Sequence, residues 1–554
     1  MADATAPCVV IGGGLAGMAA ASTILENGGK VVLLEKCSSC GGNSVKAASG
    51  INIVNTQAQK DQGIEDSVEQ FISDCVAGGA PRNYSSTDKL KILAENSVPD
   101  CDWLKKVFSV DLFSAKVARL GGHSVPRTHR NAPTATGESQ QLPGLAITSA
   151  LIKMVEKIAQ ESKGEKAKII TNAKATELIF ENEEKVTGVK YEKDGETVKQ
   201  MGAVIIATGG FGADFSSTTG CLLEKYRPDL LFDPTSNGEF ATGDGIKMAL
   251  EIGARTGDLH QVQCHPLGLI NPKDPDAKEK MVAAEALCGA GALIFDNGGK
   301  RFVNELGPRN YMTKTMQMNY ETPLRLLINK AASEEMEFYC KYYTASGHMK
   351  FYENGAALAK EWGVPVETLA EVHEAHYQAA KKQEEDPEGG EFPAYPDGQS
   401  WDKPSGSWGV GDNAKKFYAN VIPGEKFAEE PFYVATITPE VIHYCLGGLE
   451  CTTNAEVGGN IKGEKVPIPG LYAAGQVMGG IHGKNRLGGN ALLDSLVFGR
   501  IAGKACAKYT LGEENLRETD LKVLSGAIPK TANATGETKT AVPRKAGCCP
   551  KRAA

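Results

Sequence analysis

One arginine stands in a glycine-rich segment whose composition suits the binding of an anion. Arg486 lies within residues 479–494, GGIHGKNRLGGNALLD, where the flanking glycines predict a turn that leads into a helix. The planar guanidinium group of an arginine can hold a carboxylate through two parallel hydrogen bonds. We therefore expect Arg486 to bind a carboxylate group at a helix start. The alternative is a salt bridge on the protein surface.

Two histidines and a second arginine also fall in short motifs that contain proline or glycine. His265 lies in QCHP, His443 lies in VIHYCLGG, and Arg309 ends the segment NELGPR. The chain has nine histidines in all, so two of them in such motifs are candidates for ligand binding. A histidine is more often a satisfied structural group, and Arg309 has an alternative role as an ion-pair partner of Glu305 or Glu285. On the motifs alone, both interpretations remain open.

The beginning of the chain has the pattern of a nucleotide-binding unit. A short apolar strand at residues 8–14 ends in glycines, an alanine-rich helix follows, and a second strand covers residues 30–35. Three glycines in the first turn have the GxGxxG spacing, which lets the backbone and the helix start approach a pyrophosphate. Glu35 closes the second strand, where its carboxylate can accept hydrogen bonds from a ribose. Together these features predict a dinucleotide-binding βαβ unit.

These two signals lie at opposite ends of the chain, which predicts one interleaved enzyme rather than separate modules. Residues 67–107 have a helical pattern, and strands at 168–171, 175–181 and 185–191 predict a small sheet that interrupts the Rossmann topology. The apolar segment 202–210 then predicts a strand that returns to the nucleotide-binding sheet.

The middle of the chain differs in composition from both ends. Aromatic and charged helices are expected between residues 261 and 439, with an acidic, glycine- and proline-rich loop at 384–415. A strand at 471–475 and a helix at 490–509 rejoin the nucleotide-binding domain. Beyond that helix alanine, threonine, lysine and proline dominate without periodicity, which predicts a disordered tail.

Composition excludes several classes of protein. The formal net charge of −8 over 554 residues gives no basic surface for nucleic acid, and no apolar run is long enough to span a bilayer. The first strand begins too early to leave room for a signal or transit peptide, which favours a cytoplasmic location, or an organelle if a presequence was removed. Fourteen cysteines in a chain of this length do not form a disulfide framework. Cys37 and Cys40 form a CxxC pair, which we interpret as two reduced thiols in a turn, with a dithiol redox role as the alternative.

With these motifs in view, the sequence resembles the flavin subunit family of fumarate reductases and succinate dehydrogenases, above all its soluble, single-chain fumarate reductases. The marks are VVIGGGLAGMAAA, GGNSVKAASGIN, GGHSVPRTHR, IIATGGFG, TGDG, QCHP, GKRFVNELGPR, PEVIHYCLGG and GGIHGKNRLGGNALLDSLVFGR, spread over residues 7–510. The resemblance implies an α/β fold, a Rossmann-like FAD-binding domain with an inserted α+β capping (lid) domain. With the changes in composition along the chain, we expect the FAD-binding domain at residues 1–260 and 440–511, the capping domain at 261–439, and a disordered tail at 512–554.

The resemblance also implies the residues that contact FAD. These are Gly12, Gly13, Gly14, Leu15, Ala16, Gly17, Glu35, Lys36, Gly42, Asn43, Ser44, Ser49, Gly50, Ile51, Ala207, Thr208, Gly209, Asp244, Gln476, Arg486, Ala491 and Leu492. No histidine follows Gly42 in the position that some membrane-bound relatives use to tether flavin. The resemblance therefore implies noncovalent FAD, which lowers the flavin potential and favours fumarate reduction over succinate oxidation.

By the same resemblance, the chain reduces fumarate to succinate by hydride transfer from flavin N5. Arg486, His265, His443 and Gly50 would bind the small dicarboxylate substrate. Arg309 would donate the proton, because the carbanion-like carbon left after hydride addition is far more basic than a guanidine. Glu285 would return protons to Arg309.

Two features of the sequence depart from the family pattern. The family has a second arginine three residues after the glutamate, and this chain has Cys288, which puts turnover and substrate in doubt. Gln476 stands where a glutamate is common. The alternatives are a reductase or oxidase of another small anion, such as urocanate or aspartate, and a catalytically impaired electron-transfer subunit.

The sequence contains no motif for a second redox group that could deliver electrons to the flavin. There is no CxxCH haem motif, no iron–sulfur cysteine spacing and no second nucleotide fingerprint, and no metal site is expected. We expect an external electron donor: reduced flavin, a quinol-linked protein or a partner subunit.

Overall fold

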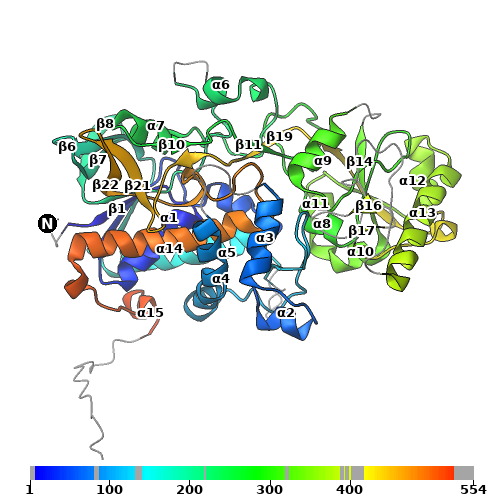
Figure 1. Ribbon diagram of the computed structural model, residues 1–554, viewed down its shortest axis with the longest axis horizontal. Helices are drawn as coiled ribbons and strands as arrows, with labels where there is room; N and C mark the ends of the chain where they lie inside the picture. Colours follow the sequence, from blue (N-terminus) through cyan, green and yellow to red (C-terminus); the bar gives the residue numbers. More distant parts are fainter. Residues whose placement is uncertain are drawn as a thin grey trace, which may run out of the picture.

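A computed structural model describes residues 6–79, 87–131, 140–216, 220–318, 323–386, 392–393, 399–400 and 417–528. The molecule has two lobes along its long axis (Figure 1). One lobe is built from both ends of the chain, and the other from its middle.

The first lobe is organised around a six-stranded sheet with the strand order β21-β22-β9-β1-β2-β5. Five of the strands are parallel, and only the edge strand β21 is antiparallel to its neighbour. The central strands are short apolar runs buried on both faces, as is usual for a parallel sheet covered by helices. The strands span β1 (Cys8–Ile11), β2 (Val31–Leu34), β5 (Ala167–Ile170), β9 (Val204–Ile206), β21 (Glu456–Ile461) and β22 (Glu464–Ala473).

Two helices from opposite ends of the chain pack against each other on this sheet. Helix α1 (Leu15–Glu26) follows β1, and helix α14 (Asn490–Leu511) lies beside it (Figure 1). Close approach is possible because α14 presents Gly499 and Gly503 to the alanine-rich face of α1. This pairing joins the N-terminal and C-terminal parts of the sequence into one domain.

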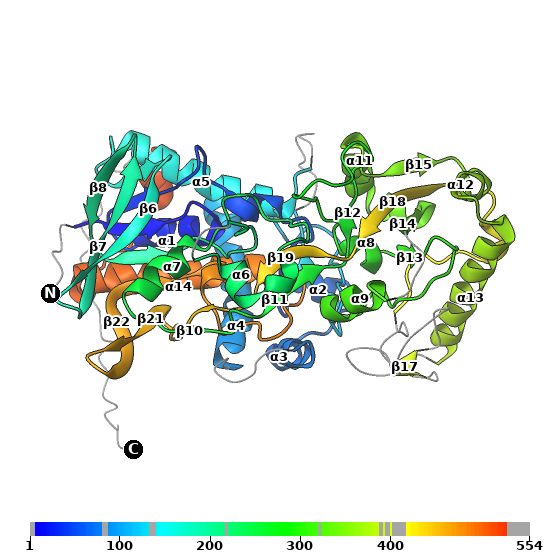
Figure 2. The ribbon, with the colours of Figure 1, turned by 90° about the horizontal axis from the view of Figure 1, so that it is seen from above.

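A separate antiparallel sheet, β6-β7-β8, stands at the outer end of this lobe (Figure 2). It consists of β6 (Lys174–Glu181), β7 (Lys185–Lys193) and β8 (Glu196–Met201). The sequence placed the segment 168–171 in this small sheet, but that segment is β5, which pairs in parallel with β2 in the main sheet. Its buried residues Ala167 and Ile170 pack in the main core, so burial rather than nearness in sequence decides its sheet.

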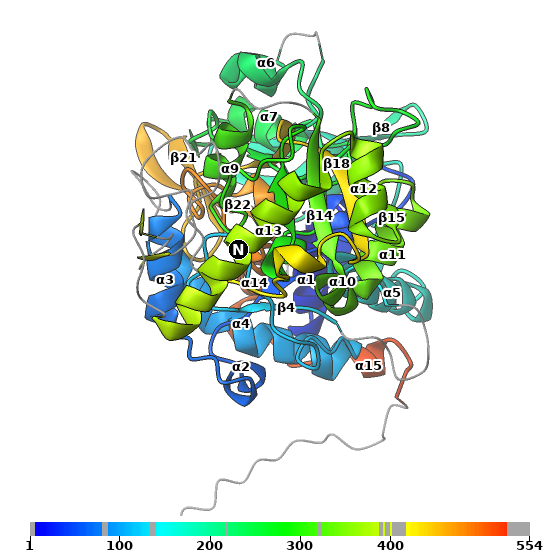
Figure 3. The ribbon, with the colours of Figure 1, turned by 90° about the vertical axis from the view of Figure 1, so that its right-hand side faces the viewer.

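The second lobe has its own sheet and its own apolar core. A path of four strands, β12-β18-β14-β13, carries β15 paired to β18, and all five lie between residues 268 and 438. Helices α9 to α13 surround the sheet, and the end-on view shows α12 and α13 on its outer side (Figure 3). The strands are β12 (Gly268–Leu269), β13 (Leu293–Phe295), β14 (Leu324–Asn329), β15 (Lys350–Tyr352) and β18 (Phe432–Thr438). The helices are α8 (Ala286–Gly289), α9 (Arg309–Met316), α10 (Lys330–Glu335), α11 (Glu337–Ala345), α12 (Gly355–Trp362) and α13 (Val366–Glu385).

Two antiparallel strands cross between the lobes. Strand β11 (Val262–His265) pairs with β19 (Val441–Cys445), and both lie at the junction of the lobes (Figure 2). A register shift between Gln263 and Cys264 interrupts the ladder. A second antiparallel pair lies in the first lobe. Its strand β10 (Thr256–Gly257) comes before β11 in the chain, and its strand β20 (Gly448–Leu449) comes after β19. The segments that connect the lobes therefore also carry His265 and His443.

The remaining elements are short or cover the first lobe. They are η1 (Gly42–Lys46), β3 (Ile51–Asn52), α2 (Gln57–Asp61), α3 (Val68–Ala77), α4 (Thr87–Phe108), β4 (Thr128–His129), α5 (Pro143–Glu161), α6 (Leu222–Tyr226), η2 (Pro228–Leu230), α7 (Asp244–Glu251), β16 (Phe392–Pro393), β17 (Gln399–Ser400), η3 (Gly424–Lys426) and η4 (Gly475–Val477). Among the described residues, no helix combines the length and apolar character needed to cross a membrane.

The end of the described chain differs from the disordered tail expected from residue 512. Segment η5 (Glu513–Asn515) and helix α15 (Leu521–Leu524) are formed, and the Thr519 N–H donates to the Glu26 carbonyl at 2.7 Å. Leu521 is buried in the main core, so a single apolar anchor fixes a segment of otherwise polar composition. Residues 529–554 lie outside the described residues. Most of the acidic loop expected at 384–415 does too.

The close contact of α1 and α14 leads to a stability prediction. A Cβ atom at Gly503 would lie 2.6 Å from the Ala20 carbonyl oxygen and 3.0 Å from Thr23 Cβ. We expect Gly503→Leu to lower the free energy of unfolding by about 3 kcal/mol or to prevent folding, because the helices must separate. Lys504→Leu, at the exposed neighbouring position, is the control and should change it by less than about 0.5 kcal/mol. Equal melting temperatures for the two variants would contradict this packing.

Candidate active site

A single cavity of about 970 Å³ extends from the glycine-rich turn after β1 to the junction of the lobes. Side chains of both lobes line it, as do both ends of the chain. Nearly all of the expected cofactor and substrate residues are on its wall. These are Gly12, Gly13, Gly14, Leu15, Ala16, Glu35, Lys36, Gly42, Asn43, Ser44, Ser49, Gly50, Ala207, Thr208, Gly209, Asp244, His265, Arg309, His443, Gln476, Arg486, Ala491 and Leu492.

At one end of the cavity, the backbone is shaped to approach a ligand closely. Gly12 has a φ of +106°, and a Cβ atom there would lie 2.4 Å from the Ala207 carbonyl oxygen. The N–H of Gly13 donates to Glu35 Oε2 at 2.8 Å, and the N–H of Leu15 donates to Ser44 Oγ at 3.1 Å. These bonds fix the turn and the start of α1, where backbone N–H groups suit a pyrophosphate.

The acidic and basic side chains at this end are held by defined partners. Glu35 accepts hydrogen bonds from the N–H groups of Gly13 and Cys37, both at 2.8 Å, which orients its carboxylate along the cavity wall. Lys36 Nζ lies 2.8 Å from Asp244 Oδ2, at the first residue of α7. The two strands and the later helix thus converge where a nucleotide's ribose would be recognised.

Several buried polar atoms on the wall have no protein partner, and they provide a test of whether FAD fits. Among the described residues, Gln476 Nε2, Thr208 Oγ1 and Arg486 Nε are buried without a hydrogen bond. Buried polar groups are normally paired, so unsatisfied atoms in three residues that line one cavity indicate a polar ligand. Together with the glycine turn, these donors fit a dinucleotide that carries a polar ring system at its far end.

The far end of the cavity holds two neutral imidazoles. The rings of His265 and His443 meet edge to face, with their centroids 4.8 Å apart. The N–H of Leu267 donates to His265 Nδ1 at 3.1 Å, which leaves the ring proton on Nε2. His443 Nδ1 lies 2.8 Å from Ser236 Oγ. Burial lowers the pKa of His265 to about 3, with the charge of Arg309 adding to the effect, so at neutral pH the ring is uncharged.

Arg309 is held by a carboxylate and an amide. Its Nε and Nη2 donate to the two oxygens of Glu285, at 2.5 and 2.9 Å, and its Nη1 donates to Gln263 Oε1 at 3.1 Å. Burial acts to raise the pKa of Glu285, but the charge and hydrogen bonds of Arg309 outweigh it and lower the pKa to about 2. Glu285 is therefore ionised at neutral pH. The Gln263 amide donates in turn to the Arg486 carbonyl at 2.9 Å, which links the two arginine segments.

Arg486 differs from Arg309 in its charge balance. It is 2% exposed, and no carboxylate of the described chain lies within ion-pair distance of it. Its Nη1 donates to the Leu487 carbonyl oxygen at 3.1 Å, while Nε is unbonded. Burial lowers the pKa of Arg486 to about 9, and the charge of Arg309 adds to the effect. The guanidinium group stays protonated at neutral pH and suits an anion in the cavity.

Three of the expected residues lie behind the cavity wall. Gly17 packs against the Gly12 carbonyl, where no Cβ fits, and Ile51 is buried in the core. Glu285 reaches the cavity only through Arg309. Cys288, which replaces the family's second arginine, is buried in α8. None of these four positions lines the cavity.

Sequence reasoning missed Gln263, Ser236 and Tyr444. Gln263 bonds Arg309, Ser236 bonds His443, and Tyr444 lies under Arg486. Gln263 lies two residues before His265 in QCHP, and Tyr444 directly follows His443 in VIHYCLGG. Their place in the histidine motifs could have identified them as candidate site residues. Ser236 lies in no such motif, and its role depends on tertiary structure.

The CxxC pair also borders the cavity, at its nucleotide end. Burial raises the pKa of Cys40 to about 12 and that of Cys37 above its usual value. Both thiols are therefore protonated at neutral pH and are poor nucleophiles, which favours two reduced cysteines in a turn. Cys548 and Cys549 lie outside the described residues.

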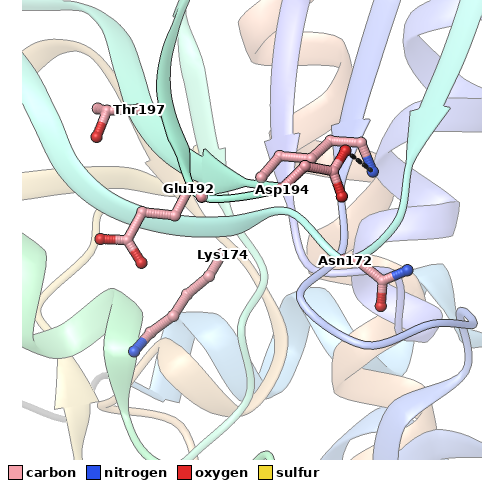
Figure 4. A pocket seen from close by; sticks show the side chains of 7 residues that line it. Asn172, Lys174, Glu192, Asp194 and Thr197 are labelled. Carbon is pink, nitrogen blue, oxygen red and sulfur yellow. Dashed lines mark ion pairs between the residues drawn. The ribbon is translucent and has the colours of Figure 1, made fainter.

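A shallower hollow of about 410 Å³ lies on the outer surface, near the β6-β7-β8 sheet (Figure 4). Asn172, Lys174, Glu192, Asp194 and Thr197 line it, with charged groups of both signs. Lys193 Nζ lies 3.9 Å from Asp194 Oδ2, so part of this charge is paired within the hollow. No convergent set of unpaired groups marks it as a second active site.

A Rossmann-like sheet, a cavity that begins at its glycine turn and a cationic far end are features of a nucleotide-binding protein that takes an anionic ligand. A family model described as an FAD binding domain matches residues 8–492, and the chain belongs to that family. A fumarate reductase of Schizosaccharomyces pombe is 39% identical over 511 residues, covering 91% of this chain and 90% of the relative. Fumarate reductase 1 of Saccharomyces cerevisiae is 35% identical over 515 residues, covering 90% of this chain and 98% of that protein.

A solved structure has the same architecture. The open conformation of a flavocytochrome c3 fumarate reductase gives a TM-score of 0.64 at 29% identity, covering 91% of this chain and 78% of that chain. The predicted family, the fold class and the FAD cofactor are confirmed. The protein is an oxidoreductase of the class that acts on CH–CH groups, as the sequence indicated.

The turn at Gly12 leads to a prediction about the cofactor. Gly12→Ala should weaken FAD binding by more than about tenfold, because the new methyl group collides with Ala207 and φ is positive. Gly63→Ala is a matched control, with a φ of +70° but no atom within 4 Å of the added Cβ. The flavin-to-protein absorbance ratio of the purified variants measures the effect. Full flavin content in Gly12→Ala would contradict the assignment of this turn.

Proposed function

We propose that this protein reduces fumarate to succinate and that the cationic end of the cavity binds the substrate. One observation carries the proposal: two buried guanidinium groups and two neutral imidazoles converge on the same cavity as the nucleotide turn. A short dicarboxylate offers one carboxylate to the unpaired guanidinium group of Arg486 and further acceptors to the remaining donors. The fumarate reductases among its relatives support the same substrate.

In this proposal each side chain has one task. Arg486 holds one substrate carboxylate through its free donors, the Nε2–H group of His265 donates to a carboxylate oxygen, and the His443 ring lies beside the His265 ring. Gly50 lines the same wall, where its φ of +121° keeps the backbone close to the ligand. Bound reduced FAD supplies the hydride. The lobes together exclude water from the reacting carbons.

Arg309 supplies the proton in this proposal, and Glu285 returns one to it. An arginine is a weak acid in water, but the carbon that receives the proton is much more basic. The positive charge of the guanidinium also stabilises the negative charge that develops on the substrate. Glu285 is suited to the return because it contacts Arg309 through both oxygens. Once Arg309 has given up its proton, Glu285 would take a proton that originates in solvent and pass it to the neutral guanidine.

Two further parts of the proposal concern the cofactor and its reduction. FAD is bound noncovalently, since η1 (GNSVK) contains no histidine, cysteine or tyrosine that could tether it. Electrons come from an external donor: reduced flavin, a quinol-linked protein or a partner subunit. Because Cys288 stands where the family has an arginine, the substrate could differ from fumarate, and urocanate is the alternative to be compared with it.

One assay tests the function directly. After photoreduction of the bound flavin without oxygen, fumarate should reoxidise it at least about a hundredfold faster than urocanate. The expected preference arises because urocanate lacks the second carboxylate, so donors at the other end of the site are left without a carboxylate acceptor. Faster reoxidation by urocanate would overturn the assignment, and reoxidation by oxygen alone would indicate an oxidase or electron-transfer protein.

A substitution tests the proton donor. Arg309→Ala should retain FAD but lower the kcat of fumarate reduction by at least about 10³, because both the acid and its charge are lost. Arg325→Ala is the control, since it removes a half-buried arginine of the same lobe that pairs with Asn297. A kcat of Arg309→Ala within about tenfold of the wild type would remove Arg309 from the acid role.

A further inference from the structure

The guanidinium group of Arg486 rests on an aromatic ring rather than on a carboxylate. Its Cζ atom lies 4.4 Å from the centroid of the Tyr444 ring. Tyr444 follows His443 in β19, so the same strand carries an imidazole at the cavity and this ring beside it. Arg309, in contrast, is neutralised by Glu285. The two buried arginines of the site are therefore supported in different ways.

Tyr444 is itself fixed by a buried acid. Its hydroxyl donates to Asp494 Oδ2 at 3.2 Å, and His482 Nε2 lies 3.4 Å from the same oxygen. The His482 ring also meets the Tyr444 ring edge to face, with centroids 5.7 Å apart. Asp494 is 1% exposed and stands in the first turns of α14. Arg486, Tyr444 and Asp494 thus form a chain in which the acid contacts the ring and not the cation.

The position of Tyr444 between Arg486 and Asp494 affects how a substrate carboxylate can bind. A carboxylate in direct contact would neutralise the arginine, and a substrate carboxylate would then have to displace it. An aromatic face attracts a cation and occupies none of its N–H donors. A hydrogen bond from the phenol to an anion increases the electron density of the ring, so Asp494 supports the cation from a distance.

We propose that Tyr444 and Asp494 are positioning residues that keep Arg486 charged, oriented and free of a protein carboxylate, and thereby set the preference for dicarboxylates. The inference rests on the proposed function, because it assigns Arg486 to a substrate carboxylate. The inference adds that the affinity of Arg486 for a substrate carboxylate depends on Tyr444 and Asp494, which take no part in the reaction itself. Binding should weaken when the acid is neutralised, even though Asp494 never contacts the ligand.

The test uses malonate, a dicarboxylate that cannot be reduced, and follows its dissociation constant through the visible spectrum of the bound flavin. Asp494→Asn and Tyr444→Phe should each weaken malonate binding by about tenfold, because each breaks the link between acid and ring. The double variant should be no weaker than the weaker single variant, since both remove the same link. Tyr444→Leu, which also removes the ring, should weaken binding by about a hundredfold.

Steady-state kinetics separate positioning from a general structural effect. The KM for fumarate should rise in parallel with the malonate dissociation constant, while kcat changes by less than about threefold. Asp100→Asn removes a buried acid that contacts Arg500 outside the cavity, and Tyr472→Phe removes a buried phenol hydroxyl. Both controls should leave malonate binding unchanged.

Three results would overturn the inference. The first is a malonate dissociation constant within about twofold of the wild type in both single variants, and the second is full additivity in the double variant. The third is a fall in kcat with an unchanged KM. If Asp494→Asn loses its flavin, Tyr444→Phe decides the question, because it removes only one hydroxyl group. If the wild-type protein binds no malonate and reduces no fumarate, the proposed function fails instead.

Discussion

The charge balance of the cavity is the constraint on which the rest of the structure depends. Two guanidinium groups are buried close enough for the charge of one to lower the pKa of the other, and a single carboxylate neutralises one of them. The neighbouring imidazoles remain neutral because burial and both cations oppose their protonation. A cavity with one unbalanced positive charge is costly when empty and favours an anionic ligand.

The fold meets this constraint by bringing the site to the segments that cross between the lobes. Strand β11 supplies Gln263 and His265, and β19 supplies His443 and Tyr444. Arg309 comes from the second lobe, and Arg486 comes from the turn before α14. Any change in the angle between the lobes therefore changes the distance between the groups that would hold a substrate.

Much of this arrangement could be predicted because it depends on local patterns. The glycine turn, the first βαβ unit and the motif blocks around His265, His443 and Arg486 carry their information within a few residues. The pairing of β5 with β2 could not be predicted, since a four-residue strand has no periodic signature of its sheet. The role of the Gln263 amide could not be predicted either. A neutral side chain that bridges two arginine segments is recognised only when the positions of both arginines in the structure are known.

The packing of α14 on α1 has a consequence for how the protein is made. During synthesis on the ribosome, the glycine turn and α1 emerge first, while Arg486 and α14 are still to be translated. The sheet likewise waits for β22, which pairs with β9 late in the chain. Pairings of such high sequence separation form slowly. The cavity is therefore complete only after β22, Arg486 and α14 have been translated, although its glycine turn is among the first parts of the chain to be made.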